Sequence, residues 1–401
     1  MNLDRRWNQG LYLGLLAVGI FALFSFIGLL AALLVDISSE LGITVPLAGQ
    51  LLTVAAVVWG VAAIMIGPLS DHYGKKPIII GGFLVFSLAL LGYSLSRSFP
   101  LLILASTLTG LGGAMTGPLI LAVVGDHFQP GVHGRIMGLV NAGSPLASLI
   151  GVPVGTLIAA HMGWRTSFLL LGALTLCVAF AGLFIIPHSN TLPPGSKASY
   201  VTSFRDAFRH KAFDYLMLAN IFRQVAFWSL FVYLPAFLIQ RYALGMQLLA
   251  FVLCIIALGQ LSGMLLGGVL ADRFDKIKLS ITMHVLIGIF GAILVGFRFE
   301  LWLVVALGAL FTGLFNATLP IFFATTVSIS PKLRGTIMGI QAASNHVGRS
   351  LGSMLGGLIL AFFDYRNIGL SCLGLSLVSS ALFFHIHYSS NLHFDHLDPE
   401  S

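Results

Sequence analysis

The sequence predicts an all-α membrane protein with twelve transmembrane helices, arranged as two pseudo-symmetric six-helix halves. Hydrophobic residues make up 57% of the 401 residues and charged residues only 9%, whereas a soluble domain carries about 25% charged residues. Apolar segments of bilayer-spanning length recur along the whole chain, and the two halves share motifs at a constant spacing. The net charge of +7 is spread over short loops, which argues against a nucleic-acid-binding surface.

Twelve apolar segments, separated by short polar clusters, predict the individual spans. Each is near the length of about 20 residues that crosses a bilayer as a helix. The first segment is longer than the apolar part of a signal peptide, about 7–15 residues, so we expect it to be retained. The predicted spans are 10–35, 44–70, 77–96, 99–125, 134–161, 164–186, 212–242, 244–271, 276–297, 300–327, 334–362 and 365–388.

The distribution of basic residues predicts the orientation of these spans. Of the 21 Lys and Arg residues, fourteen fall on the side of the N-terminus, five on the opposite side and two within spans. Basic residues concentrate in cytoplasmic loops. We therefore expect a multi-pass protein of the cell inner membrane with both termini in the cytoplasm.

The longest predicted connection divides the chain into two halves. Residues 187–211 contain a Pro-Pro-Gly-Ser run and four basic residues, which fits either a plain tether or an amphipathic helix on anionic lipid. The expected domains are a six-helix bundle over 1–186, a cytoplasmic linker over 187–211, a second six-helix bundle over 212–388 and a cytoplasmic tail over 389–401.

An internal repeat with an offset of 201 residues supports this division. Because each half holds an even number of spans, the repeat is parallel, and two such halves rocking about a binding site is typical of secondary transporters. The matched positions are Gly67 to Asp71 with Gly268 to Asp272, Gly134 with Gly335, Gly155 with Gly356, and Trp164-Arg165 with Tyr365-Arg366.

The segment Gly67-Pro-Leu-Ser-Asp71-His-Tyr-Gly74-Lys75-Lys76 resembles the signature of the major facilitator superfamily between spans two and three. A fainter copy runs from Gly268 to Lys276. The Trp164-Arg165-x-x-Phe168 opening of span six, with Asp126 ending span four, is similar to the twelve-span drug:proton antiporter branch. The chain departs from that branch at residues 106–112, which lack the Arg of its span-four motif, and at residues 151–155, which keep only part of its span-five motif.

The resemblance implies a conformational latch at the cytoplasmic ends of the spans. By analogy with the family, Asp71 would bind the start of span eleven and Asp272 that of span five, holding the outward-facing state closed. The alternative is that both are solvated turn residues. The implied latch residues are Gly67, Asp71, Gly74, Lys75, Asp126, Gly268, Asp272 and Arg273.

Two arginines, Arg223 and Arg349, fall within predicted spans, where a charge costs about 2.5–3.5 kcal/mol on insertion scales. None of the fourteen carboxylates is central in a span, so the two arginines predict a positive site that favours an anionic substrate. The alternative is that each arginine bonds backbone carbonyls and stabilises a helix contact. Phe21, Phe24 and Trp59 fit an aromatic wall or plain packing.

The remaining candidates share polar helix faces with these arginines or lie elsewhere within spans. We expect Arg223 to be the main substrate anchor, assisted by Arg349, Asn220, Gln224, Trp228, Gln341, Asn345, Asn141 and Asn316. Asp36 and His346 are candidate proton carriers, or else a helix cap and a structural histidine. The loosely spaced histidines near the C-terminus and three cysteines in apolar runs predict no metal site, disulfide or cofactor.

These observations predict a monomeric secondary transporter that works by alternating access. The resemblance implies proton-coupled efflux, and the arginines indicate an anionic or carboxylate-bearing compound such as a drug, metabolite or siderophore. The expected partners are this small molecule, protons and the lipid bilayer, with no nucleic acid. The alternatives are proton-coupled uptake of an organic anion, a membrane-embedded lipid-modifying enzyme, which would need a clustered nucleophile and base, and a non-transporting sensor.

Overall fold

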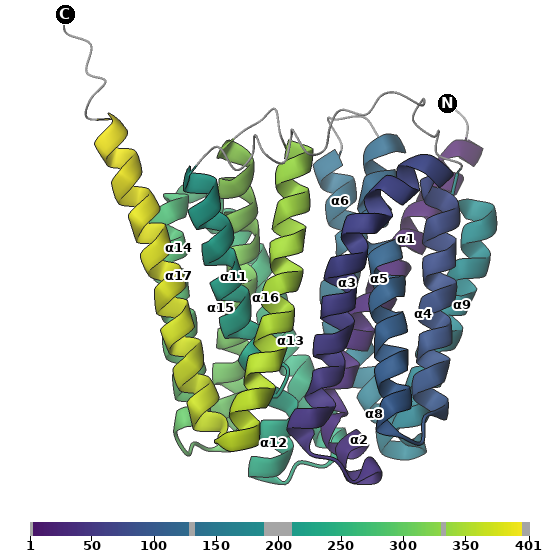
Figure 1. The fold of residues 1–401 in the computed structure, drawn as a ribbon, viewed down its shortest axis with the longest axis horizontal. Coiled ribbons are helices and arrows are strands. Elements are labelled where there is room, and N and C mark those ends of the chain that lie inside the picture. The colour runs from purple at the N-terminus through teal and green to yellow at the C-terminus, as the bar shows by residue number, and fades with distance from the viewer. Residues whose placement is uncertain (1–2, 128–132, 188–210, 330–333, 395–401) are drawn as a thin grey trace, which may run out of the picture. The chain divides into compact units, whose positions relative to one another are not determined.

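The computed structural model describes residues 3–127, 133–187, 211–329 and 334–394, and the regular elements within these ranges are helices (Figure 1). They group into two compact units. Unit 1 comprises Met1–Ser196 and Tyr233–Cys254, and unit 2 comprises Lys197–Val232 and Ile255–Ser401. The predicted linker falls largely outside the described residues, so the domain boundaries at residues 187 and 211 stay predictions.

All but one of the helices assigned wholly to unit 1 lie in the first half of the chain, and the exception is α12. They are α1 (Leu3–Ala32), α2 (Leu34–Leu41), α3 (Val45–Tyr73), α4 (Lys75–Leu95), α5 (Phe99–His127), α6 (His133–Asn141), α7 (Gly143–Leu146), the π-helix η2 (Ala147–Gly151), α8 (Val152–Met162), α9 (Trp164–Ile185) and α12 (Leu234–Tyr242).

The helices of unit 2 are longer and less interrupted. They are α11 (Lys211–Phe231), α14 (Lys276–Gly296), α15 (Leu301–Ile329), α16 (Arg334–Phe362) and α17 (Tyr365–Phe394), while α13 (Met246–Arg273) passes from unit 1 to unit 2 at Cys254.

Eleven helical segments of the described chain are long and apolar enough to cross a membrane. They coincide with eleven of the predicted spans. The predicted twelfth span is α16, which at 29 residues is also long enough but carries the polar stripe that includes Asn345 and Arg349. The expected fold, an all-α membrane protein, is therefore confirmed.

Helix starts follow local capping chemistry. Thr44 precedes α3, accepts a hydrogen bond from the Leu47 N–H at 3.4 Å, and is followed by Pro46 in the first turn, a position that tolerates proline because its N–H would be unpaired in any case. Asp275 caps α14 in the same way, accepting from the Lys278 N–H at 2.8 Å.

Three predicted spans are less regular than their sequences suggest. The first ends at Ala32 rather than at residue 35, because Leu33 leaves helical geometry with φ −99° and ψ 8°, and α2 then begins as a separate helix. The seventh is divided into α11 and α12, the latter with Pro235 in its first turn. The fifth is divided into α6, α7, η2 and α8.

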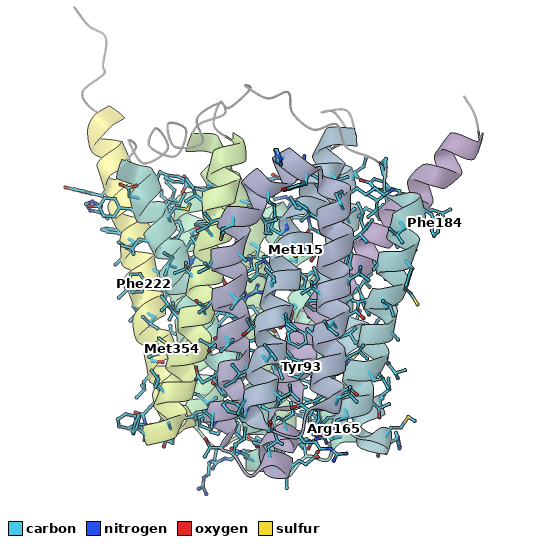
Figure 2. The ribbon with its side chains drawn as sticks, turned by 45° about the vertical axis from the view of Figure 1, so that its right-hand side comes forward. Tyr93, Met115, Arg165, Phe184, Phe222 and Met354 are labelled. Carbon is cyan, nitrogen blue, oxygen red and sulfur yellow. The ribbon has the colours of Figure 1, made fainter. Side chains whose placement is uncertain are left out.

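Each unit has its own apolar core. In unit 1, Phe26 of α1 packs edge-on against Phe86 and Tyr93 of α4 with ring centroids 5.6 and 5.4 Å apart. The buried hydroxyl of Tyr93 is 2.5 Å from Ser106 Oγ of α5. Figure 2 shows Tyr93 among the helices and Phe184 pointing away from them, consistent with an exposed fraction of 88% for Phe184.

Close helix contact in unit 2 depends on small residues. Gly263 of α13 lies against the backbone of Gly313 of α15, where a Cβ would come within 2.6 Å of the Gly313 Cα. Such small-residue contacts let transmembrane helices approach without the hydrophobic driving force available in water.

Candidate functional site

The strongest concentration of buried polar side chains in unit 2 lies on one face of α11. Asn220, Arg223 and Gln224 are respectively 0%, 1% and 4% exposed, and Trp228 continues the face at 8%. Because these positions are spaced three or four residues apart, they share one side of the helix. The structure therefore brings together four of the predicted substrate-binding residues.

Arg223 is held by neutral oxygen acceptors on two helices. Its Nη1 donates to Thr318 Oγ1 of α15 at 2.5 Å, and its Nη2 and Nε donate to Asn220 Oδ1 at 2.7 and 3.2 Å. Its guanidinium carbon also lies 4.9 Å from the ring centroid of Phe315 and 5.3 Å from that of Phe322. In the described part of the chain no carboxylate accepts from it, so the positive charge is solvated by dipoles and aromatic faces alone.

A second layer of hydrogen bonds joins α11 to α16. The amide nitrogen of Asn220 donates to Ser344 Oγ at 2.6 Å and to Asn345 Oδ1 at 2.8 Å. Asn345 Oδ1 also accepts from Gln224 Nε2 at 2.7 Å. The amide oxygen of Asn220 thus accepts hydrogen bonds from Arg223, and its amide nitrogen donates to α16. These bonds on both sides fix the orientation of the amide.

Glycines allow this polar seam to close. A Cβ on Gly352 of α16 would lie 2.9 Å from both the Trp228 Cβ and the Val225 carbonyl oxygen, and Gly348 lies equally tight against Gln224. The close approach of α16 to α11 explains why short side chains such as Ser344 and Asn345 reach across.

Trp228 links the seam to the second membrane arginine. Its Nε1 donates to Gln224 Oε1 at 3.1 Å, while the guanidinium carbon of Arg349 lies 4.3 Å from its ring centroid. Arg349 is partly exposed, in contrast to Arg223. The two arginines therefore share one network, and Arg349 is the more exposed of the two.

The other predicted substrate residues do not join this network in the same way. Asn141 of α6 donates to the Met137 carbonyl at 3.0 Å and Asn316 of α15 to the Thr312 carbonyl at 2.9 Å, each within its own helix. Gln341 is 9% exposed on α16, four residues before Asn345. His346, which was predicted as a candidate proton carrier and not as a substrate residue, is partly exposed beside Asn345 on the same helix.

The predicted latch residues are only partly described. The side chains of Asp71 and Asp126 lie outside the described part of the structure. Gly74 joins α3 to α4 with φ +85°, a conformation that favours glycine. Asp272 and Arg273 end α13 with exposed side chains, Lys75 is partly exposed at the start of α4, and a Cβ on Gly67 or Gly268 would meet no atom within 4 Å.

Asp36, the predicted proton carrier of unit 1, lies on α2 next to a charged cluster. It is half-buried, and burial together with the nearby Glu40 carboxylate raises its pKa. Glu40 accepts hydrogen bonds from Arg165 Nη1 and from Trp164 Nε1, the latter at 2.6 Å, and these bonds lower its pKa. Arg165 also donates to the Ser96 carbonyl at 2.7 Å, so the cluster ties α2 to the adjoining ends of α4 and α9.

Four residues of the unit 2 network were not predicted as site residues: Thr318, Ser344, Phe315 and Phe322. Serine and threonine are common in membrane helices, where they usually bond the preceding turn of their own helix. Thr318 and Ser344 also make such bonds, to the Phe315 and Gln341 carbonyls. The sequence therefore contains little that separates them from ordinary helix residues. Trp59 in unit 1 packs closely on Gly113 and Gly117 of α5, a packing role.

Comparison with protein families gives a match to the Major Facilitator Superfamily over residues 15–294 and 216–397. The structure is similar to that of the nucleoside transporter NupG, with a TM-score of 0.75, 14% sequence identity, and coverage of 94% of this chain and 99% of that one. This structural likeness concerns the fold.

Sequence relatives carry different names. The chain is 25% identical to an uncharacterised transporter of this superfamily, YceJ of Bacillus subtilis, over 82% of this chain and 84% of that protein. It is 26% identical to a chloramphenicol resistance protein of Streptomyces lividans over 65% and 66% of the two chains. It is also 26% identical to the 3-(3-hydroxy-phenyl)propionate transporter of Escherichia coli over 75% and 74%. The family match extends over nearly the whole sequence, and the chain belongs to the Major Facilitator Superfamily of membrane transporters.

Proposed function

We propose that this secondary transporter exports a small organic compound bearing a carboxylate, by alternating access and coupled to proton entry. The single observation that supports an anionic substrate is the pair of membrane arginines in one network without a carboxylate partner for Arg223 in the described chain. An arginine fork binds carboxylates bidentately. A bound anion would supply the charge that the network lacks.

We assign different roles to the two arginines. Arg349 is partly exposed and rests on the Trp228 face, and we assign it the contact with the substrate carboxylate. Arg223 is 1% exposed, and its donors are engaged by Asn220 and Thr318. We therefore propose Arg223 as a positioning residue that orients Asn220 and the seam, rather than as the main anchor expected from the sequence.

The names of the relatives support the carboxylate class and leave two directions of transport. The Escherichia coli relative is named for 3-(3-hydroxy-phenyl)propionate, whose carboxylate ends a short chain attached to an aromatic ring. The Streptomyces relative is named for drug resistance, which favours efflux. Proton-coupled uptake of an organic anion is the second candidate, because the name of the Escherichia coli relative gives an anionic substrate and no direction of transport.

The proposal extends to coupling and topology. Asp36 is the preferred proton carrier because burial and the nearby Glu40 raise its pKa, with His346 as the second candidate. We base the proposed latch at Asp71 and Asp272 and the monomeric state on the family resemblance. We base the cytoplasmic position of both termini on the distribution of basic residues.

Thermal stability of the purified protein in detergent tests the substrate class. The probes are 3-(3-hydroxyphenyl)propionate as anion, chloramphenicol as neutral compound and tetraphenylphosphonium as cation. A ligand that binds the folded state raises the melting temperature. We expect stabilisation by the anion, loss of it in Arg349→Gln, and retention in the control Arg366→Gln, whose side chain is exposed at the start of α17. Stabilisation by the cation alone, unchanged in Arg349→Gln, contradicts the proposal.

Kinetics separate the roles of the arginines. With radiolabelled propionate in proteoliposomes, Arg349→Gln should raise KM, because a ground-state contact is lost. Thr318→Val, which disturbs only the support of Arg223, should change KM less than Arg349→Gln, and Thr318→Ser should restore it. Equal KM changes in Thr318→Val and Arg349→Gln would contradict the assignment of Arg349 as substrate contact and Arg223 as positioning residue.

The direction of proton coupling needs an imposed gradient. In inverted vesicles, acidification of the lumen should drive accumulation of the anion by an exporter that exchanges it for protons. An uptake system that moves proton and anion together should instead expel the anion from the same vesicles. Asp36→Asn should abolish the effect of the gradient while leaving equilibrium exchange, because a carrier that cannot protonate still changes conformation when loaded.

A further inference from the structure

The amide of Asn345 is held in one orientation from two sides. Its Oδ1 accepts from Asn220 Nδ2 at 2.8 Å and from Gln224 Nε2 at 2.7 Å. Each of these two amides is fixed in turn by a side chain that can only donate. Arg223 donates to Asn220 Oδ1, and the indole of Trp228 donates to Gln224 Oε1. Because neither donor can face an amide nitrogen, both chains of hydrogen bonds point the Asn345 oxygen toward α11.

The amide nitrogen of Asn345 is the group that this network leaves over. It donates to no protein acceptor in the described part of the chain, and it keeps accessible surface on a partly exposed side chain. Turning the amide over would break two hydrogen bonds and bring N–H groups face to face. The two N–H groups of Asn345 are therefore fixed in direction and have no acceptor within the described protein.

The depth of Asn345 in the membrane indicates what these N–H groups face. Asn345 lies eleven residues after α16 begins at Arg334, which is about 16 Å along the helix axis and about half the thickness of the hydrocarbon core. An amide without an acceptor is costly in hydrocarbon, so a polar interior fits this position better than lipid. Arg349 lies one helical turn further on the same face and is also partly exposed. The two donor-bearing residues are about 6 Å apart along one helix.

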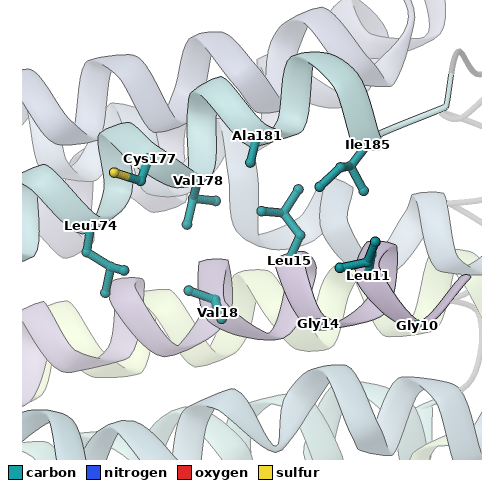
Figure 3. Close-up of a pocket in the computed structure, with 10 residues that line it drawn as sticks. All are labelled: Gly10, Leu11, Gly14, Leu15, Val18, Leu174, Cys177, Val178, Ala181 and Ile185. Carbon is teal, nitrogen blue, oxygen red and sulfur yellow. The ribbon is translucent and has the colours of Figure 1, made fainter. Parts of the chain in front are cut away.

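The groove between α1 and α9 in unit 1 differs in its chemistry (Figure 3). Its volume is about 740 Å³, and its lining side chains are apolar apart from the Cys177 thiol. It presents no amide or cation that could bind a carboxylate or a second oxygen. Polar recognition of the substrate is therefore sought on α16 of unit 2.

We propose that Asn345 determines specificity by donating its amide N–H groups to a substrate oxygen other than the carboxylate. The inference rests on the proposed function, in which Arg349 binds the carboxylate. It narrows the substrate class to carboxylates that carry a second acceptor oxygen, as an ether, carbonyl or hydroxyl group, about 6 Å from the first. Arg223 acts through this residue without touching the substrate, since it sets the direction of the Asn220 amide and thereby that of Asn345.

Competition binding to the purified protein in detergent tests the second contact. Radiolabelled 3-phenylpropionate is displaced by the unlabelled acid or by its ortho-, meta- and para-methoxy derivatives, whose ether oxygen accepts hydrogen bonds and cannot donate them. In wild type we expect one methoxy isomer to bind about fivefold more tightly than the parent acid. That ratio corresponds to one net hydrogen bond of about 1 kcal/mol.

Two amide-to-acid variants separate the contact from its support. Asn345→Asp keeps an oxygen toward α11 and replaces the N–H groups by an acceptor. Its charge should weaken all four acids, and the preference for the methoxy isomer should disappear, so the ratio of affinities isolates the hydrogen bond. Asn220→Asp still accepts from Arg223 but cannot donate to Asn345, so it should reduce the preference by allowing that amide to turn over. The control Gln247→Glu, at an exposed position of α13, should keep the preference.

Equal affinity of the parent acid and all three isomers in wild type, or a preference unchanged in Asn345→Asp, overturns the inference and leaves Asn345 as a link between α11 and α16. Asn345→Ser removes the amide nitrogen without adding a charge and should also abolish the preference, which keeps the test decisive if the aspartate variant does not fold. Failure of wild type to bind any of the acids has a different meaning. It contradicts the carboxylate substrate of the proposed function, and this inference with it.

Discussion

The guanidinium of Arg223 shows how a buried charge is tolerated without an ionic partner. Two neutral side chains, Asn220 and Thr318, accept its hydrogen bonds, and two phenylalanine rings lie against its faces. Hydrogen bonds to charged groups stabilise more than neutral ones, about 1.5–3 kcal/mol against about 1. The acceptors of this arginine therefore matter more for stability than ordinary polar side chains of a membrane helix.

Thr318→Val should lower the free energy of unfolding by about 1–3 kcal/mol, because it leaves one N–H of a buried guanidinium without an acceptor. The measurement is unfolding of the purified protein in detergent, followed by tryptophan fluorescence. Thr318→Ser keeps the hydroxyl and should retain most of the stability. A valine variant as stable as wild type would mean that water or a rotated Asn220 takes over the bond.

The contact that Glu40 of α2 makes with Trp164 and Arg165 of α9 should be sensitive to acid. Its pKa lies below the ordinary 4.5 because Arg165 and Trp164 donate to the ionised form. A carboxylate with a lowered folded-state pKa contributes stability that is complete above about pH 4.5 and is lost as the pH falls through its folded-state value. The melting temperature of wild type should therefore fall below pH 4.5 more steeply than that of Glu40→Gln. Parallel curves for the two proteins would show that the contact contributes little, as for many exposed ion pairs.

At the scale of the helices, small residues determine which spans touch. Gly263→Ala should destabilise the protein by about 1–3 kcal/mol, a typical cost of overpacking, since the new methyl would collide with the Gly313 backbone. Gly268→Ala on the same helix is the control, because no atom lies within 4 Å of its Cβ position. If both variants melt at the wild-type temperature, α13 and α15 can separate without cost.

The helices also show what can be predicted from sequence. Long apolar runs identified the spans, because a lipid environment requires about 20 apolar residues in a row. Composition does not reveal the break at Leu33 or the π-helical turn at 147–151, since both leave apolarity unchanged and depend on backbone geometry. The polar face of Asn220, Arg223 and Gln224 could be predicted from spacing along one helix. Its partners Thr318 and Ser344 could not, because contacts between helices are not encoded in the periodicity of either.

For the whole molecule, the orientation in the membrane is the property that most directly governs the proposed direction of transport. In a variant without native cysteines, Ser39→Cys and Arg273→Cys place exposed thiols at predicted outer and inner ends of spans. A membrane-impermeant maleimide added to intact cells should label only Ser39→Cys, and both should react after permeabilisation. Labelling of Arg273→Cys in intact cells would invert the topology and with it the assignment of the basic loops.

The π-helical turn in span five limits how far the two halves of the chain can be treated as copies. The offset of 201 residues holds on both sides of it, at Gly134 with Gly335 and at Gly155 with Gly356, so no insertion accompanies the turn. A π turn nevertheless takes up one more residue than an α turn, whereas α16 continues as regular α-helix over the matching segment. Beyond Gly151, aligned residues are therefore out of phase by about 100° around their own helix axes. The internal repeat preserves the order of the residues but not the direction in which their side chains point. The ends of spans five and eleven beyond the turn can therefore carry different chemistry while still aligning in sequence.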